Sequence, residues 1–414
     1  MTDLLHRAKN IEQRIQELAR CTDDPVCIHR LFGTPAFLQG CSLVEQWFKQ
    51  AGLDTRIDNI GNVRGRLNSK GATKTFVIAS HIDTVANAGK YDGPLGVLMG
   101  LDIVHQLAIE QKTLPFNIEI IAFADEEGAR FHSTFLGSAV VAGSFDDALL
   151  ATKDEKGITL KEAIQHIGGN PERLKTDRIP ANEWLGYFEI HIEQGPVLYE
   201  AKQPVAIVTS IAGQIRATLS FAGQAGHAGT VPMAMRSDAL CCAAECIIAI
   251  EQYALNNAQV VATVGKLDIT NQASNVIPGE VVCSLDVRSA NEDELDKAFQ
   301  DITRLVNNIA PKRNITVNLH LVQNTLPVKC DYHLNFLMKR AIVQAGLPVQ
   351  ELVSGAGHDA IAIAAVAPVA MLFVQCYKGI SHNPLEAVET TDIAAALQVS
   401  DIFFQNVINY YNQP

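Results

Sequence analysis

Three short apolar runs in the first half of this 414-residue chain end in side chains that bind metal ions. The runs and the groups that close them are Thr75–Ala79 with His81, Asn117–Phe123 with Asp125, Glu126 and Glu127, and Tyr187–Ile192 with His191. Runs of this length and composition are typical of buried strands. Because functional groups gather at the carboxyl ends of strands in α/β sheets, the pattern predicts imidazoles and carboxylates along one sheet edge.

The segments between these runs have the apolar spacing of helices. Val97, Leu101, Val104 and Ala108, for example, recur every three or four residues, which is typical of an amphipathic helix. Strands that alternate with helices predict the α/β fold class, with a sheet covered on both faces.

The pattern changes over residues 212–327, where a separate β-α-β-β-α-β order is expected. The expected elements are strands at 215–221, 259–267, 280–288 and 315–322, and helices at 238–253 and 291–309. This order is the split βαβ, or ferredoxin-like, arrangement. The first pattern resumes after Pro327, so we expect residues 1–211 and 328–414 to form a metal-binding catalytic domain and residues 212–327 to form an inserted domain.

Composition narrows the set of partners and compartments. The formal net charge is −12 and the pI is about 5.5, which argues against a nucleic-acid partner because phosphate binding requires a basic face. The first residues lack the apolar segment of a signal peptide, and no apolar run is long enough to cross a bilayer. Nine scattered cysteines without a CxxC pair favour reduced thiols and a cytoplasmic protein without membrane partners.

Seven short motifs together resemble one enzyme family. They are Ser80–Thr84, Asp125–Phe131, His191–Pro196, Gly226–Thr230, Asn275–Gly279, Gly355–Asp359 and Ser381–Pro384. Their order and spacing, over nearly the whole chain, are similar to the hydantoinase/carbamoylase branch of the di-metal aminoacylase and carboxypeptidase family. That branch includes N-carbamoyl-L-amino-acid hydrolases, allantoate amidohydrolases and ureidoglycolate amidohydrolases. The resemblance implies a di-metal exopeptidase-like catalytic domain with an inserted lid and dimerisation domain.

The resemblance implies five ligands for two divalent metal ions. Asp92 would bridge both ions, His81 and His191 would complete the first site, and Glu127 and His382 would complete the second. Two neighbouring cations repel each other, so a shared anionic oxygen suits such a pair. Nitrogen and oxygen ligands without cysteine suit zinc, manganese, cobalt or nickel.

The resemblance also implies three catalytic roles. Glu126 matches the general base, which would take a proton from water and pass it to the leaving nitrogen. Asp83 resembles the carboxylate that orients the imidazole of His81. His227, in the inserted domain, resembles the histidine, often from the partner subunit, that stabilises the oxyanion.

Five further residues are candidates for substrate binding. Arg288, Asn275 and Gln194 resemble residues that hold a substrate carboxylate, and Arg216 lies near the domain junction. A guanidinium grips a carboxylate in a bidentate manner, but a surface ion pair is the alternative role of Arg288. His358 is either a substrate-side residue or part of a glycine-rich turn.

We expect hydrolysis of the ureido C–N bond of N-carbamoyl-L-amino acids, which releases amino acid, ammonia and carbon dioxide. The segment Thr134–Ser138 resembles carbamoylases, while allantoate or ureidoglycolate amidohydrolase and a dipeptidase or aminoacylase are the alternatives. A non-catalytic binding protein with the same fold is a further alternative. Loss of a metal ligand or of the general base would favour it, and the sequence keeps all of these residues. A homodimer through the inserted domain and hinge closure near 211–213 and 325–328 are also expected.

Overall fold

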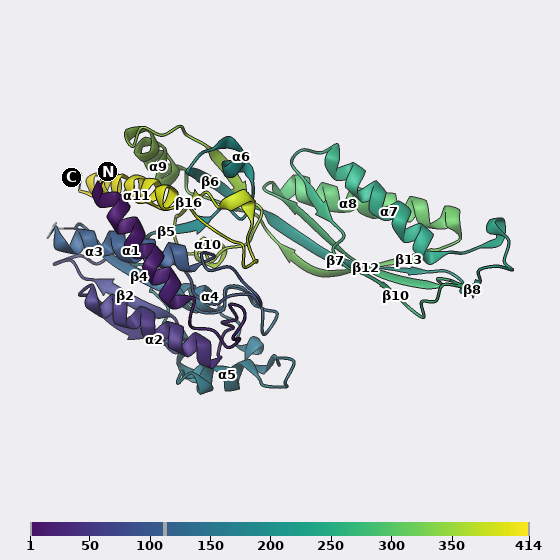
Figure 1. The fold of residues 1–414 in the computed structure, drawn as a ribbon, viewed down its shortest axis with the longest axis horizontal. Helices are drawn as coiled ribbons and strands as arrows, with labels where there is room; N and C mark the ends of the chain where they lie inside the picture. Colours follow the sequence, from purple (N-terminus) through teal and green to yellow (C-terminus); the bar gives the residue numbers. More distant parts are fainter. Residues whose placement is uncertain (1, 111–113, 413–414) are drawn as a thin grey trace. The chain divides into compact units, whose positions relative to one another are not determined.

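The structure is a computed structural model that describes residues 2–110 and 114–412. It consists of two compact units, which are coloured by sequence in Figure 1. The larger unit comprises Met1–Thr209 and Cys330–Pro414, and the inserted unit comprises Ser210–Lys329. Among the residues described, no helix is both long and apolar enough to cross a membrane.

The larger unit is built on a mixed sheet of nine strands, whose edge strand β14 is formed by the last two residues of the inserted unit. Its strand order is β1-β2-β4-β3-β5-β16-β6-β14, and β15 also pairs with β6. The strands are β1 (Asp54–Ile57), β2 (Val63–Leu67), β3 (Thr75–His81), β4 (Asn117–Phe123), β5 (Trp184–Ile192), β6 (Val205–Ile211), β14 (Val328–Lys329), β15 (Glu351–Ser354) and β16 (Val369–Val374). The four neighbours β4, β3, β5 and β16 are parallel, while the flanking pairs are antiparallel.

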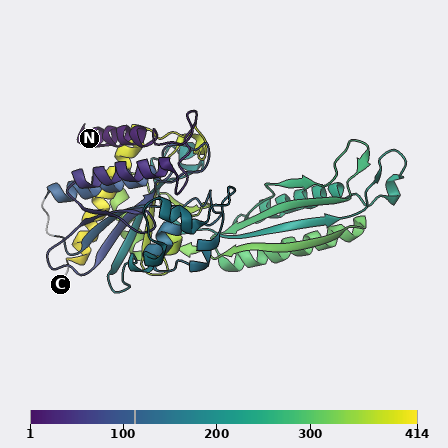
Figure 2. The same cartoon turned by 90° about the horizontal axis from the view of Figure 1, so that it is seen from below.

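Helices cover both faces of this sheet, as the sequence predicts (Figure 2). Every residue of β3, β4 and β16 is buried, which requires a covering layer on each side. The helices of the unit are α1 (Thr2–Leu18), α2 (Pro35–Gln50), α3 (Pro94–Ile109), α4 (Leu136–Ala142), α5 (Leu160–His166), α6 (Val197–Ala201), α9 (Tyr332–Gln344), α10 (Ala360–Ile363) and α11 (Thr390–Tyr411). Helix α3 packs on β3, β4 and β5, and α1 packs on α3 and α11.

The strand order makes β3 a topological switch point. The chain leaves β3 for β4 on one side and later returns to place β5 on the other side. Ligand sites of open α/β sheets lie outside the carboxyl ends of the strands at such a point. His81, the last residue of β3, therefore occupies the position where a site is expected.

The turn before α3 is shaped by Gly93. Its φ of 82° is a conformation that L side chains rarely adopt, and Pro94 then begins the helix. A Cβ atom on Gly93 would lie 2.5 Å from Cε1 of His81. Glycine is therefore needed here both for the backbone conformation and for the close approach to the imidazole ring.

The inserted unit is a sheet of order β10-β12-β7-β13, with β9 also paired to β12. Its elements are β7 (Gly213–Ala222), β8 (Gly226–His227), α7 (Ala239–Leu255), β9 (Val261–Thr263), β10 (Leu267–Ile269), β11 (Val276–Ile277), β12 (Glu280–Ser289), α8 (Glu292–Ile309) and β13 (Thr316–Thr325). Helices α7 and α8 pack on each other and on β7 and β12. This arrangement is the split βαβ fold that the sequence predicts.

Two features of the inserted unit differ from the sequence prediction. The single strand expected at 259–267 is two short strands, β9 and β10, on the same side of β12. Thr263 pairs with Asp286 and Leu267 pairs with Cys283, so four steps along this segment lie opposite three steps along β12. The extra residue between the two strands is a β-bulge. The second feature is the small β8–β11 ribbon, which the sequence pattern did not indicate.

Candidate metal centre and active site

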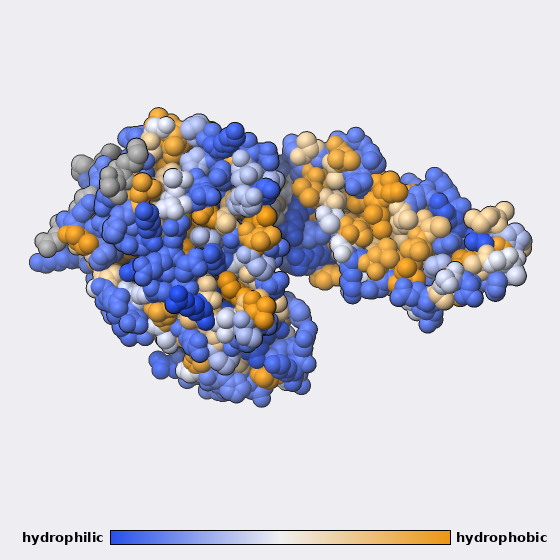
Figure 3. All heavy atoms as spheres, viewed as in Figure 1, coloured by the Kyte–Doolittle hydropathy of each residue, from blue (hydrophilic) through white to orange (hydrophobic). Residues whose placement is uncertain are grey.

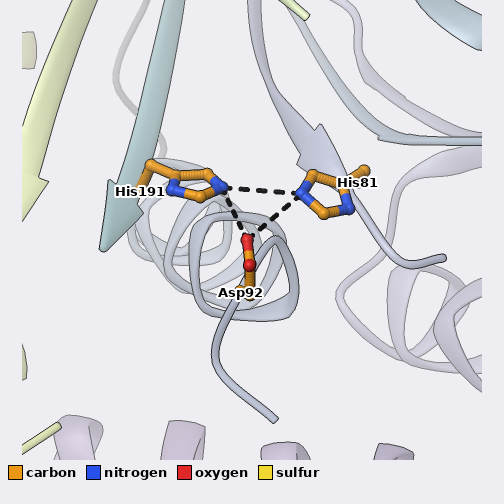
Figure 4. Close-up of side chains that lie close together, drawn as sticks. All are labelled: His81, Asp92 and His191. Atoms are coloured by element: carbon orange, nitrogen blue, oxygen red, sulfur yellow. Dashed lines mark hydrogen bonds and ion pairs between the residues drawn. The ribbon is translucent and has the colours of Figure 1, made fainter. Parts of the chain in front are cut away.

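Three elements of the larger unit bring His81, His191 and Asp92 together (Figure 4). His81 ends β3, His191 lies near the end of β5, and Asp92 lies in the turn before α3. Asp92 Oδ1 is 3.2 Å from His191 Nε2 and 3.6 Å from His81 Nε2. All three side chains are buried, so strand ends and a tight turn supply a cluster shielded from water.

Backbone carbonyls fix how the two imidazoles point. His81 Nδ1 lies 3.2 Å from the carbonyl oxygen of Asp83, and His191 Nδ1 lies 2.9 Å from that of Ile192. If each Nδ1 donates to its carbonyl, the neutral rings present bare Nε2 atoms, which face each other at 3.5 Å. Two facing lone pairs beside a carboxylate repel unless a cation lies between them, so this donor set fits a metal ion.

The second oxygen of Asp92 faces a second group of ligands. Asp92 Oδ2 is 3.0 Å from His382 Nε2, and Glu127 Oε1 is 3.6 Å from the same nitrogen. One ligand atom from each of Asp92, Glu127 and His382 lies within 4.8 Å of the others, as do those of His81, Asp92 and His191. The two groups share Asp92 but approach its different oxygens.

The pKa values show that this cluster favours positive charge. Burial by itself raises the pKa of Asp92, but its contacts with His191, His382 and His81 outweigh this effect and hold the pKa well below its ordinary value. The hydrogen bond to Asp92 raises the pKa of His382 to about 9. Burial lowers the pKa of His81, yet Asp92 and Glu126 more than offset this effect and raise it.

Glu126 and Glu127 lie in a turn beyond β4, not on the strand itself. Asp125 begins this turn with a φ of 54°. One ligand atom from each of His81, Glu126 and Glu127 lies within 4.8 Å of the others, so both glutamates reach the cluster. Glu126 Oε2 approaches His81 Nε2 at 4.0 Å. Burial raises the pKa of Glu126 well above its ordinary value and that of Glu127 to about 7, whereas a nearby cation would lower both.

The carboxylate of Asp83 holds this turn. Its Oδ1 accepts the backbone N–H of Glu126 and its Oδ2 accepts that of Glu127, each at 3.1 Å. Its distance to His81 Nδ1 is 3.7 Å, longer than the 3.2 Å from that nitrogen to the backbone oxygen of Asp83 itself. The carboxylate therefore positions the turn that carries Glu126 and Glu127 more directly than it positions the imidazole.

His358 and Gln194 both lie at the cluster. His358 is 1% exposed and its ring packs against His191 with centroids 4.5 Å apart. Burial lowers its pKa well below the ordinary value, and its Nε2 lies 2.8 Å from Ser354 Oγ. Gln194 Nε2 donates to Asp92 Oδ2 at 2.9 Å, so its amide contacts the shared carboxylate.

The inserted unit groups the remaining candidates into two pairs. His227 pairs with Val276 across the β8–β11 ribbon, which places it beside Asn275. His227 Nδ1 accepts the N–H of Gly229 at 3.0 Å, so the proton of the neutral ring lies on Nε2.

The second pair is Arg216 and Arg288, which lie on the neighbouring strands β7 and β12. Both guanidinium groups contact the carboxylate of Asp286: Arg288 Nε donates to Oδ1 at 2.9 Å, and Arg216 Nε lies 3.3 Å from Oδ2. Both guanidinium groups lie at one carboxylate, and a guanidinium has the donor geometry to hold an anionic ligand.

Two residues at the cluster were not predicted from the sequence. Ser381 Oγ lies 2.9 Å from Asp92 Oδ2, and Glu386 accepts the backbone N–H groups of Tyr91 and Asp92. Ser381 directly precedes His382 in the sequence, and this adjacency to an expected metal ligand could have identified it. Glu386 lies almost three hundred positions from Asp92, and no spacing rule links the two.

Comparison with known proteins places the chain in a family. The profile of peptidase family M20/M25/M40 matches residues 77–406. An allantoate deiminase of Arabidopsis thaliana is 38% identical over 420 residues, which cover 92% of this chain and 79% of that protein. An N-carbamoyl-L-amino acid amidohydrolase of Geobacillus stearothermophilus is 37% identical over 395 residues, which cover 95% of this chain and 97% of that protein.

Solved structures agree with these relatives. A hydantoinase/carbamoylase family amidase from Burkholderia multivorans has a TM-score of 0.88 at 32% identity, covering 96% of this chain and 97% of that one. Enzymes of the M20 family depend on metals, and the cluster around Asp92 is the candidate metal site of this chain. The chain therefore belongs to peptidase family M20/M25/M40, in its hydantoinase/carbamoylase branch, and is a hydrolase that acts on C–N amide bonds.

Proposed function

We propose that the chain hydrolyses the ureido C–N bond of a linear ureido acid at a two-metal centre. The observation that carries the proposal is the division of the Asp92 carboxylate between two ligand groups, one on each oxygen. His81 and His191 would hold one ion, and Glu127 and His382 would hold the other. When bound, such ions lower the pKa of a coordinated water and polarise the scissile carbonyl.

Glu126 is proposed as the general base. It is buried beside the cluster, and its backbone is held by Asp83. Its carboxylate accepts a proton from the attacking water and then donates it to the departing nitrogen. The carbamate that leaves decomposes to ammonia and carbon dioxide.

His227 is proposed to stabilise the oxyanion. Its Nδ1 is occupied by the N–H of Gly229, so Nε2 carries the proton and can donate it to a developing negative charge. Arg288, with Arg216 next to it, is proposed to bind the substrate carboxylate, and Asp286 keeps the guanidinium oriented.

Three further side chains are proposed to contact the substrate. Asn275 lies beside His227 in the β8–β11 ribbon, and Gln194 and His358 lie at the metal cluster. The low pKa of His358 keeps its ring neutral, so one ring nitrogen can donate and the other can accept.

N-carbamoyl-L-amino acids are the proposed substrates, with allantoate as the second candidate. The Geobacillus relative supports the first and the Arabidopsis relative supports the second, at nearly equal identity. A dipeptidase or aminoacylase activity is the alternative outside ureido compounds. All three use the same attack on an amide carbonyl, so the substrate class must be measured.

We further propose a homodimer formed through the inserted unit, which would also act as a lid. Figure 3 shows apolar side chains gathered on the face of this unit that carries α7 and α8. Ile248 and Leu255 of α7 are 61% and 71% exposed, and a shallow groove lies between Cys241 and Arg313. Contiguous exposed apolar surface of this kind is typical of an interface.

The positions of the two ligand pairs support a shared active site. Residues 216 and 222 lie on β7, and the rise per residue of a strand separates them by about 20 Å. The ribbon that carries His227 follows residue 222, at the far end of β7 from Arg216. Arg288 pairs with Gln214 at the opposite end of the same sheet. A small ureido acid is too short to touch both, so we propose that His227 and Arg288 at one substrate come from different chains.

The test is ammonia release by metal-reconstituted protein on N-carbamoyl-L-amino acids, allantoate, ureidoglycolate and simple dipeptides. Turnover of a ureido acid that is lost in Glu126→Gln supports the proposal and selects the substrate. Cleavage of dipeptides alone would refute ureido hydrolysis, and silence on every compound would refute the enzymatic role of this site.

A further inference from the structure

Glu386 is a buried carboxylate with three hydrogen-bond donors around it. It is 2% exposed and lies in the loop before α11. Its Oε1 accepts the backbone N–H of Tyr91 at 2.6 Å and that of Asp92 at 3.1 Å. Its Oε2 lies 3.0 Å from the hydroxyl of Ser381. A buried carboxylate that accepts two backbone N–H groups and contacts a hydroxyl fixes the position of these groups.

The donors come from the two segments that carry facing metal ligands. Tyr91 and Asp92 belong to the turn before α3, while Ser381 precedes His382 in the loop after β16. Ser381 Oγ also lies 2.9 Å from Asp92 Oδ2. Glu386 therefore connects the backbone of the shared ligand to the loop that carries His382.

The turn also packs closely against the Glu386 side chain. A Cβ atom on Gly89 would lie 2.2 Å from Cδ of Glu386 and 2.3 Å from its Oε1. The φ of Gly89 is outside the left-handed region, so an alanine meets only this steric conflict and no backbone strain. A larger residue at position 89 would therefore displace the carboxylate from its donors.

We propose that Glu386 is a positioning residue of the metal centre. By holding the backbone of Tyr91 and Asp92 together with the hydroxyl of Ser381, it sets the separation between the shared carboxylate and His382. This inference rests on the proposed metal site, and it adds a residue that is not among the proposed ligands of the metals or the substrate. Partners of metal ligands affect metal affinity because they hold the ligand atoms in place.

The test is zinc binding to metal-free full-length protein, measured by competition with a chromophoric chelator. Glu386→Ala is expected to raise the dissociation constant of the weaker zinc site about 10- to 100-fold, the usual effect of losing such a partner. Glu386→Gln is expected to bind zinc nearly as the wild type does. Its amide oxygen can accept both N–H groups, and its NH₂ group can donate to Ser381.

Two further variants separate positioning from stability. Asp331→Ala removes the N-cap of α9, where Asp331 accepts the N–H of Leu334, so it should lower the urea midpoint and leave zinc affinity unchanged. Gly89→Ala keeps the carboxylate but displaces it, so it should weaken zinc binding as Glu386→Ala does. Gly89→Ala decides the matter if Glu386→Ala does not fold.

The outcomes distinguish this inference from the proposed function. Zinc affinity at the wild-type level in both Glu386→Ala and Gly89→Ala would overturn the positioning role. Equal losses in Glu386→Gln and Glu386→Ala would overturn it as well, because charge and not hydrogen-bond geometry would then be responsible. A wild-type protein that binds no zinc would refute the metal site itself.

Discussion

Asp83→Asn tests whether one carboxylate holds the turn that carries Glu126, the proposed general base. In the wild type, the two oxygens of Asp83 accept the backbone N–H groups of Glu126 and Glu127 at 3.1 Å, and the residue is 1% exposed. Asparagine can accept one of these groups, but its NH₂ then faces the other. The substitution therefore loses one bond to a charged acceptor and leaves one buried N–H unpaired.

The expected cost follows from these two effects. A hydrogen bond to a charged group contributes about 1.5–3 kcal/mol, and an unpaired buried donor costs about 1–3 kcal/mol, so the folded state should lose about 2.5–6 kcal/mol. If about 3 kcal/mol of this loss appears as displacement of Glu126 in the transition state, kcat falls about 100-fold. The substitution leaves the backbone carbonyl of residue 83, which holds His81 Nδ1, in place. A loss of kcat would therefore report on the turn that carries Glu126 and not on the orientation of His81.

The assays are urea unfolding of the metal-free protein and steady-state kinetics on whichever of the ureido acids or dipeptides the wild-type protein hydrolyses. Asp331→Ala is the matched control. It removes a single N-cap hydrogen bond of α9, which is not part of the cluster, and should cost about 1 kcal/mol. If Asp83→Asn is no less stable than this control and retains the wild-type kcat, the reasoning about the turn is wrong.

Three other predictions concern the base, the metal and the dimer. Glu126→Gln should lower kcat about 10²- to 10⁴-fold with unchanged zinc content, and a small change in kcat would exclude Glu126 as the base. The pKa of His382 is about 9, so the ring must lose a proton before it binds a cation. Zinc affinity should therefore rise from pH 7 to 9 with proton release at pH 7, and a flat profile would contradict this assignment. Finally, Glu126→Gln and His227→Ala chains can be mixed in equal amounts and allowed to exchange subunits. If His227 acts across a dimer, half of the dimers are mixed and one of the two sites in each is intact, so about one quarter of wild-type activity should return. No recovery would place His227 in the same chain as the site it serves.

The strand ends were predictable because they follow from local pattern. Buried parallel strands are continuous apolar runs, and their polar ends meet at one sheet edge. His81 and His191 could therefore be placed near each other from the sequence. The split βαβ order of the inserted unit was also readable, because its strands and helices have different apolar periods.

The rest depends on contacts that periodicity does not encode. The expected strand at 259–267 is divided by a bulge, which depends on its register with β12. Glu126 and Glu127 both reach the cluster from a turn that begins at the left-handed backbone of Asp125, which the apolar pattern of the preceding strand does not predict. Glu386 meets Asp92 only through the folding of two distant loops.

The most direct test of the two-metal account is an anomalous difference map from crystals of the zinc-loaded protein. The account predicts two peaks, one on each side of the Asp92 carboxylate. The first should be bound by His81 and His191, and the second by Glu127 and His382. A single peak, or two peaks that do not share Asp92, would contradict the account.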